Sequence, residues 1–183
     1  MSTHSAIRRI TFNALMLALL CLVGMFSIPL GDNIKVSLQL LIVFIICLTA
    51  RSFVDALIVT GCYLLIGLFA PVYAGFASGI SPTFGYVISF VVISPIIYFM
   101  NKIPKLPSVV RMGLACLTGL LVCYVIGTAF MMLYLGLAKD VHWDLGKTLL
   151  VSVVPYIPFD LAKIVLAVSI VKLIPASLLE TKR

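Results

Sequence analysis

Six apolar segments, separated by proline, glycine or charged residues, dominate the sequence. A helix needs about 20 apolar residues to cross the hydrocarbon core of a bilayer, and all but the second segment approach that length. Lipid offers no hydrogen-bond partners to the backbone, so such segments are expected to be helical. We expect six transmembrane helices, at residues 10–28, 36–50, 53–70, 83–100, 109–137 and 148–174.

The composition agrees with a surface that faces lipid. Hydrophobic residues make up 63% of the 183 residues and charged residues 10%, which is more apolar surface than a soluble domain of this length can bury. We therefore expect an all-α integral membrane protein with a single transmembrane domain, residues 1–183. The net charge is +7, but the basic residues flank the apolar segments instead of forming a patch, so we expect no binding to nucleic acid.

The basic residues also indicate the orientation, because lysine and arginine collect in cytoplasmic loops. Three of them, Lys35, Lys139 and Lys147, lie on one side, and Lys163 falls within the sixth segment. Nine lie on the other side: Arg8, Arg9, Arg51, Lys102, Lys105, Arg111, Lys172, Lys182 and Arg183. Both termini are therefore expected to be cytoplasmic. The first segment is long for a cleavable signal peptide and lacks a clean cleavage site, so we keep it in the mature protein.

Motifs for catalysis or metal binding are not evident. Gly146, Lys147 and Thr148 resemble the end of a P-loop, but the glycine required five residues before Gly146 is replaced by Val141. The five cysteines lie inside apolar segments and are expected to be packing residues. We expect no catalytic residue, no metal and no cofactor, so any ATP hydrolysis must come from another chain.

An ionisable pair, Asp160 and Lys163, lies inside the last apolar segment. Residues at i and i+3 share a helix face, so both side chains can point into one cavity. Placing such a charge in lipid costs about 3 kcal/mol, and ionisable groups inside spans usually mark a solute pathway. Lys163 can donate to a carboxylate, and Asp160 can accept from N–H groups. The alternative is a purely structural pair whose charges neutralise each other and hold the last helix.

Further features favour a cavity near this pair. Pro155 and Pro158 are expected to break the helix, and free backbone groups are tolerated in a membrane where they line a cavity. Ser37 and Gln39, at the outer end of the second segment, could reach a solute. The uncharged loop at residues 71–82, rich in glycine and serine, is compatible with a flexible lid or an ordinary connector.

Two other patterns are ambiguous. Tyr73, Tyr86 and Tyr124 could each line a pocket or lie in an interfacial aromatic belt, and the belt is the commoner position for a single tyrosine. Ala14 and Ala18 are four residues apart, a spacing that lets another helix approach closely but that is common by chance.

Taken together, these motifs resemble the BioY family, the substrate-binding S components of energy-coupling factor (ECF) vitamin transporters. The clearest match is VPYIPFDLAK at residues 154–163, which contains the family's P-x-x-P-x-D-x-x-K pattern. Residues 28–39 (IPL…VSLQ) and 71–90 (PVYAG…SPTFGYVISF) also match. Ala14 and Ala18 match the family's A-x-x-x-A motif on the first helix.

The resemblance implies an S-component fold of six helices with a vitamin pocket open to the outside. By the resemblance, Asp160 and Lys163 would bind the polar parts of the vitamin and Gln39 would line the pocket. From their positions in the sequence, we add Tyr86 and Ser37 as expected substrate-binding residues. The expected gating loop, taken from the composition of residues 71–82, contains Tyr73, Gly75, Phe76, Ser78 and Gly79.

The resemblance also implies the partners. A transmembrane coupling subunit would dock on Ala14 and Ala18, and two cytoplasmic ATPase subunits would drive transport. The S component itself would hydrolyse nothing, and the solute would cross as the S component topples within the lipid. The chain would be a multi-pass protein of the prokaryotic plasma membrane.

The cargo implied by the resemblance is biotin or lipoate. Phe76 and Phe84 stand where the family leads us to expect glycine, and the loop carries no charge. Each unpaired group of biotin's ureido ring would cost about 1–3 kcal/mol, whereas the dithiolane ring of lipoate is apolar. Biotin is slightly favoured from the family, and lipoate is a close second.

Two other functions are weaker hypotheses. A stand-alone channel or secondary transporter usually contains an internal repeat, and the halves of the sequence show no convincing one. An intramembrane enzyme using Asp160 as an acid–base group would need a second titratable partner, and only Lys163 is found.

Overall fold

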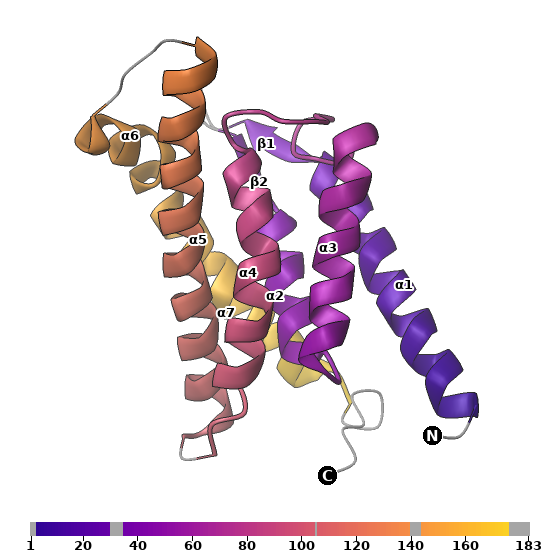
Figure 1. Ribbon diagram of the computed structural model, residues 1–183. Helices are drawn as coiled ribbons and strands as arrows, with labels where there is room; N and C mark the ends of the chain where they lie inside the picture. The colour runs from indigo at the N-terminus through magenta and orange to yellow at the C-terminus, as the bar shows by residue number, and fades with distance from the viewer. Residues whose placement is uncertain (1–2, 30–34, 105, 140–143, 176–183) are drawn as a thin grey trace.

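The computed structural model describes residues 3–29, 35–104, 106–139 and 144–175. Two short strands, β1 (Ser27–Pro29) and β2 (Lys35–Ser37), form an antiparallel hairpin at one end of a helical bundle (Figure 1). The helices are α1 (Thr3–Met25), α2 (Gln39–Thr49), α3 (Phe53–Phe69), α4 (Phe84–Met100), α5 (Ser108–Lys139), α6 (Leu145–Ser152) and α7 (Ile157–Leu173). The helical class predicted from the sequence is confirmed.

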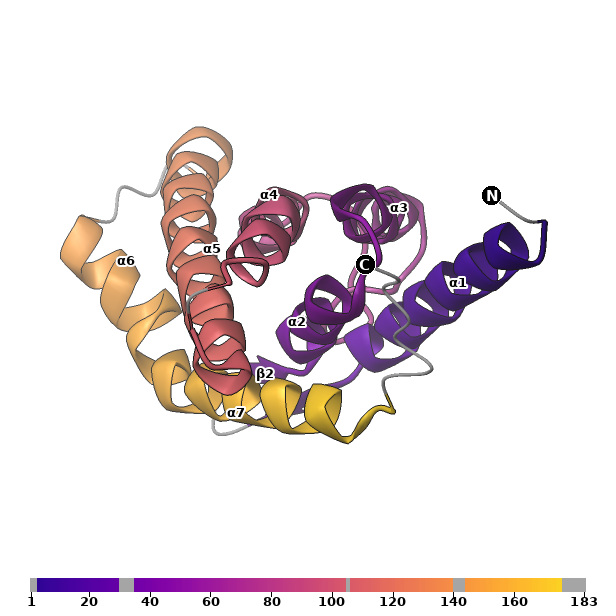
Figure 2. The ribbon, with the colours of Figure 1, turned by 90° about the horizontal axis from the view of Figure 1, so that it is seen from below.

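The second apolar segment forms the centre of the bundle. Figure 2 shows α2 with α1, α3, α4 and α7 around it, and all 11 residues of α2 are buried. A helix that is hydrophobic on every side is stable only when other elements cover it. At 1.5 Å per residue α2 is about 16 Å long, roughly half of the hydrocarbon thickness. Its short length is tolerated because α2 meets protein, not lipid, along its sides.

The boundary expected between the first two segments is wrong. The first helix ends at Met25, and Ile28 pairs with Val36 in the hairpin, so neither residue is helical. Hydropathy alone cannot separate a short apolar strand from the end of an apolar helix. The pairing satisfies backbone hydrogen-bonding groups of both strands. Pro29 lies in the first strand and would prevent a helix from continuing there.

The sixth segment is broken as the prolines predict. The first piece, α6, ends at Ser152, a 3-10 turn covers Val154–Tyr156, and α7 starts at Ile157. Pro155 and Pro158 occupy early positions of the turn and of α7, where a missing N–H group costs least. Asp160 therefore lies in the first turn of α7, where the helix dipole favours a negative charge.

Three stretches of the described residues are long and apolar enough to cross a membrane, at Ala6–Met25, Ser108–Ala138 and Leu145–Leu173. The remaining helices, α2, α3 and α4, are apolar and shorter. The start of α1, the connections α2–α3 and α4–α5, and the end of α7 lie together at one end, opposite the hairpin (Figure 1). These elements carry most of the described basic residues, so the residues expected on one side do lie at one end of the bundle. Lys105, Lys182 and Arg183 lie outside the described residues.

Candidate functional site

A cavity of about 370 Å³ lies between the hairpin end of α2, the loop after α3, and helices α4 to α7. This volume falls within the range of small-molecule sites. Its apolar lining consists of nine residues: Leu40, Ala74, Ala77, Phe84, Val87, Phe90, Cys123, Met131 and Val151. Its polar lining consists of Ser37, Gln39, Tyr73, Ser81, Thr83, Tyr86, Tyr124, Ser152, Tyr156, Asp160 and Lys163.

The predicted ionisable pair forms the charged part of this lining. The Nζ of Lys163 donates to Asp160 Oδ1 at 2.7 Å, and the hydroxyl of Tyr124 donates to Asp160 Oδ2 at 2.7 Å. Asp160 is 5% exposed and Lys163 6%, so each charge depends on its partners for stability. Lys163 keeps further N–H groups, and a carboxylate accepts more than two hydrogen bonds. The pair therefore presents a charged donor and a charged acceptor side by side.

Gln39 is held in position by a second polar network. Its Nε2 donates to the hydroxyl of Tyr63, which in turn donates to the carbonyl of Val72 at 2.9 Å. The hydroxyl of Ser37 donates to Gln39 Oε1 at 3.2 Å. These bonds link the hairpin, α2, α3 and the following loop, so both predicted residues reach the cavity from a fixed wall.

Tyr86 reaches the cavity because a glycine leaves room for it. A Cβ atom at Gly127 of α5 would lie 2.3 Å from the Tyr86 ring, so the ring rests directly on the α5 backbone. The Tyr86 hydroxyl donates to the carbonyl of Ser152 at 3.2 Å. Tyr86 thereby joins α4, α5 and the end of α6 beside the cavity.

Tyr73 anchors the predicted gating loop. Its hydroxyl donates to the carbonyl of Leu64 at 2.6 Å, and its ring occupies the space that a side chain at Gly67 would need. Backbone hydrogen bonds join Tyr73 and Ala77 in both directions. Burial raises the pKa of Tyr73 to about 12, still further above physiological pH than the pKa of a free phenol.

The other predicted loop residues do not line the cavity. Gly75 and Gly79 have φ angles of 75° and 74°, which a glycine adopts at low cost. Ser78 is exposed. Of the five predicted gating-loop residues, Tyr73 lines the cavity. Gly75, Phe76, Ser78 and Gly79 do not.

The two phenylalanines expected to replace glycine have different positions. Phe76 has φ 58°, a left-handed conformation that favours glycine. Its side chain is 60% exposed and packs edge-on against Phe26. Phe84, by contrast, is buried in the cavity wall. Of these two phenylalanines, therefore, only Phe84 lines the cavity.

Ala14 and Ala18 are exposed on α1 and take no part in the cavity. Ala14 borders a groove of about 450 Å³ between α1 and α3. The structure thus separates the predicted docking residues from the predicted substrate-binding residues.

Sequence reasoning missed one aromatic residue of the cavity, Tyr156, and left Tyr124 open between a pocket and an interfacial belt. Tyr124 and Tyr156 both line the cavity, as Tyr73 and Tyr86 do. Tyr124 lies near the middle of a 32-residue helix, far from either interface, which was a usable signal. Tyr156 stands between the two prolines that break the last segment.

Comparison with curated proteins finds no match. Among solved structures, the chain is similar to a crystal structure described as "the S-component for biotin from an ECF-type ABC transporter". The two chains are 22% identical, the alignment covers 94% of this chain and 93% of that chain, and the TM-score is 0.79, which confirms the S-component fold. The model of the BioY family matches residues 1–180, and the chain therefore belongs to the BioY family.

Proposed function

We propose that this protein is the substrate-binding subunit of an ECF-type importer for a biotin-like vitamin. The observation that carries the proposal is the buried group Asp160, Lys163 and Tyr124 in the wall of a small-molecule cavity. Membership of the BioY family and the fold of a biotin S-component support the same function. The protein would bind its cargo in the prokaryotic plasma membrane without catalysing a reaction.

The cavity suits a cargo with polar groups and an apolar chain. Lys163 would donate to a polar oxygen of the vitamin, and Asp160 would accept from its N–H groups or hold Lys163 in position. Ser37, Gln39 and Tyr86 would form the remaining polar wall. The apolar side chains between these groups would cover the hydrocarbon part of the cargo.

Biotin is the preferred cargo, with lipoate second. The hydroxyl-rich lining offers several partners for a ureido ring, which would otherwise lose about 1–3 kcal/mol for each unpaired group. Because Phe76 lies outside the cavity, it no longer favours an apolar head group; Phe84 and the uncharged loop still do. These two features remain as the reason to test lipoate.

Release of the cargo would need partner subunits. A transmembrane coupling subunit would dock on the exposed Ala14 and Ala18 of α1, and two cytoplasmic ATPases would supply the energy. The loop would open around its anchor, Tyr73, with Gly75 to Gly79 changing conformation.

A titration of the purified protein in lipid nanodiscs tests the proposal. Biotin and lipoate are compared with octanoate, which has a carboxylate and an apolar chain but no ring. Tight binding of biotin alone supports the preferred cargo, and tight binding of lipoate alone means that the ring pocket has been rebuilt. Binding of neither vitamin would refute the proposal. Uptake into vesicles should require the coupling and ATPase subunits; conduction by the protein alone would indicate a channel.

A further inference from the structure

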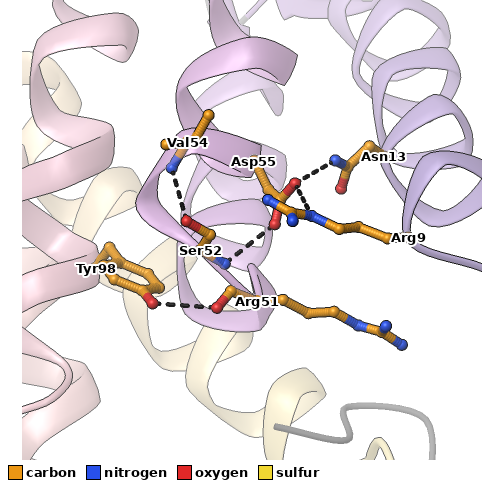
Figure 3. A network of polar contacts seen from close by, with 7 residues as sticks. All are labelled: Arg9, Asn13, Arg51, Ser52, Val54, Asp55 and Tyr98. Carbon is orange, nitrogen blue, oxygen red and sulfur yellow. Dashed lines mark hydrogen bonds and ion pairs between the residues drawn. The ribbon is translucent and has the colours of Figure 1, made fainter. Parts of the chain in front are cut away.

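Asp55 connects the first and third helices at the end of the bundle opposite the hairpin (Figure 3). Arg9 Nε donates to Asp55 Oδ1 at 2.6 Å, and Asn13 Nδ2 donates to the same oxygen at 2.8 Å. Arg9 and Asn13 lie four residues apart on α1, so both point from one face of the helix. Asp55 is 3% exposed and the Arg9 side chain 31%, so these bonds form a partly buried polar junction. We call Arg9, Asn13 and Asp55 the α1 clasp.

The same carboxylate also caps its own helix. Asp55 Oδ2 accepts from the backbone N–H of Ser52 at 3.1 Å, and the hydroxyl of Ser52 accepts from Val54 N at 3.3 Å. This reciprocal capping box satisfies backbone donors at the start of α3. One oxygen is sufficient for the cap. The other oxygen, Oδ1, accepts hydrogen bonds from Arg9 and Asn13 of α1. A capping role does not require these two bonds.

The clasp lies beside a groove between α1 and α3. The adjoining groove of about 450 Å³ separates Ala14 and Leu17 of α1 from Ile58 and Cys62 of α3. Farther along α1, Leu20 is fully buried in the core. The half of α1 nearer the hairpin packs into the apolar core, and the clasp joins the half that begins at Thr3 to α3 across the groove.

We propose that the α1 clasp positions α1 for docking on the coupling subunit and has no part in vitamin binding. The inference rests on the proposed function, in which Ala14 and Ala18 form the docking surface. Ala14 follows Asn13 directly, so a change in the angle of this half of α1 moves the docking surface. None of the three clasp residues lines the vitamin cavity.

Two variants break the α1 side of the clasp while leaving the cap of α3 intact. Arg9→Gln removes the charge and the ion pair, and Asn13→Ala removes the second donor without any change of charge. The matched control is Arg51→Gln, which removes one positive charge at the same end of the bundle. Figure 3 shows the Arg51 guanidinium pointing away from Asp55, and its backbone carbonyl keeps the hydrogen bond from Tyr98.

Each variant is measured for vitamin affinity in nanodiscs and for uptake in vesicles that contain the partner subunits. We expect the Kd of both clasp variants to stay within about twofold of wild type while uptake falls by roughly tenfold, as for residues that modulate coupling between distant sites. Arg9→Lys, which keeps the charge, should recover part of the uptake, and Arg51→Gln should change neither quantity.

Three results would overturn the inference. Unchanged uptake in both clasp variants would show that α1 needs no clasp. A parallel loss of affinity and uptake would show that the clasp only supports the fold. An equal loss of uptake in Arg51→Gln would assign the effect to charge in general. A wild-type protein that binds no vitamin would instead refute the proposed function.

Discussion

Replacing Lys163 with methionine separates the role of the charged pair in stability from its role in binding. The substitution removes the ammonium and keeps a long apolar side chain. Asp160 then remains 5% exposed and loses the partner of Oδ1, while Tyr124 still donates to Oδ2. A double variant, Asp160→Asn with Lys163→Met, removes both charges and leaves the hydrogen bond from Tyr124 possible.

The two variants should differ strongly in stability. Removing one member of a buried ion pair typically costs about 3–5 kcal/mol, and we expect the lower end because Tyr124 still satisfies one oxygen. For a chain of this length, a loss of about 3 kcal/mol lowers Tm by roughly 6–12 °C. The double variant should return to within about 1 kcal/mol of wild type, because no uncompensated charge is buried.

Vitamin affinity should follow a different pattern. A hydrogen bond to a charged group contributes about 1.5–3 kcal/mol, so both the single and the double variant should bind the vitamin about 10- to 150-fold more weakly. Thermal unfolding is measured without vitamin, because bound ligand raises Tm, and Kd is measured by titration. Wild-type affinity in the double variant would mean that the pair is purely structural. An unchanged Tm in Lys163→Met would refute the electrostatic argument itself.

Three further predictions concern other positions. Tyr124→Phe should lower the free energy of unfolding by about 1.5–3 kcal/mol, because a buried carboxylate oxygen loses its donor; an unchanged thermal unfolding curve would contradict this. Gly127→Ala should weaken vitamin binding about tenfold or more by displacing the Tyr86 ring, whereas Gly113→Ala, on the same helix with open space around it, should leave the titration unchanged. Ala14→Trp should preserve vitamin affinity and abolish uptake, and normal uptake would remove the case for docking on this face.

Local features of the sequence predicted much of the fold. The limits of α3, α4 and α5 agree with the expected segments within two residues, since each end is marked by a proline, a glycine or a charge. Pro155 and Pro158 correctly predicted the broken last segment, because proline removes a backbone donor wherever it stands. The i, i+3 spacing also correctly placed Asp160 and Lys163 together.

Contacts between distant segments could not be predicted in this way. Tyr124 meets Asp160 across 36 residues, and Arg9 meets Asp55 across 46. Hydropathy gave no indication of the hairpin or of the outward position of Phe76, because apolar residues are compatible with either a strand or a helix and with either side of a loop.

The sequence by itself determined which segments are apolar, which end carries the basic residues, and where the last helix breaks. These properties belong to consecutive residues. Only the tertiary structure decided which side chains from different helices meet. The helices are apolar on most of their surface, so no narrow hydrophobic stripe sets their rotation. Their rotation is set by the packing of specific pairs, such as Tyr86 on Gly127, and by buried polar groups that must find partners.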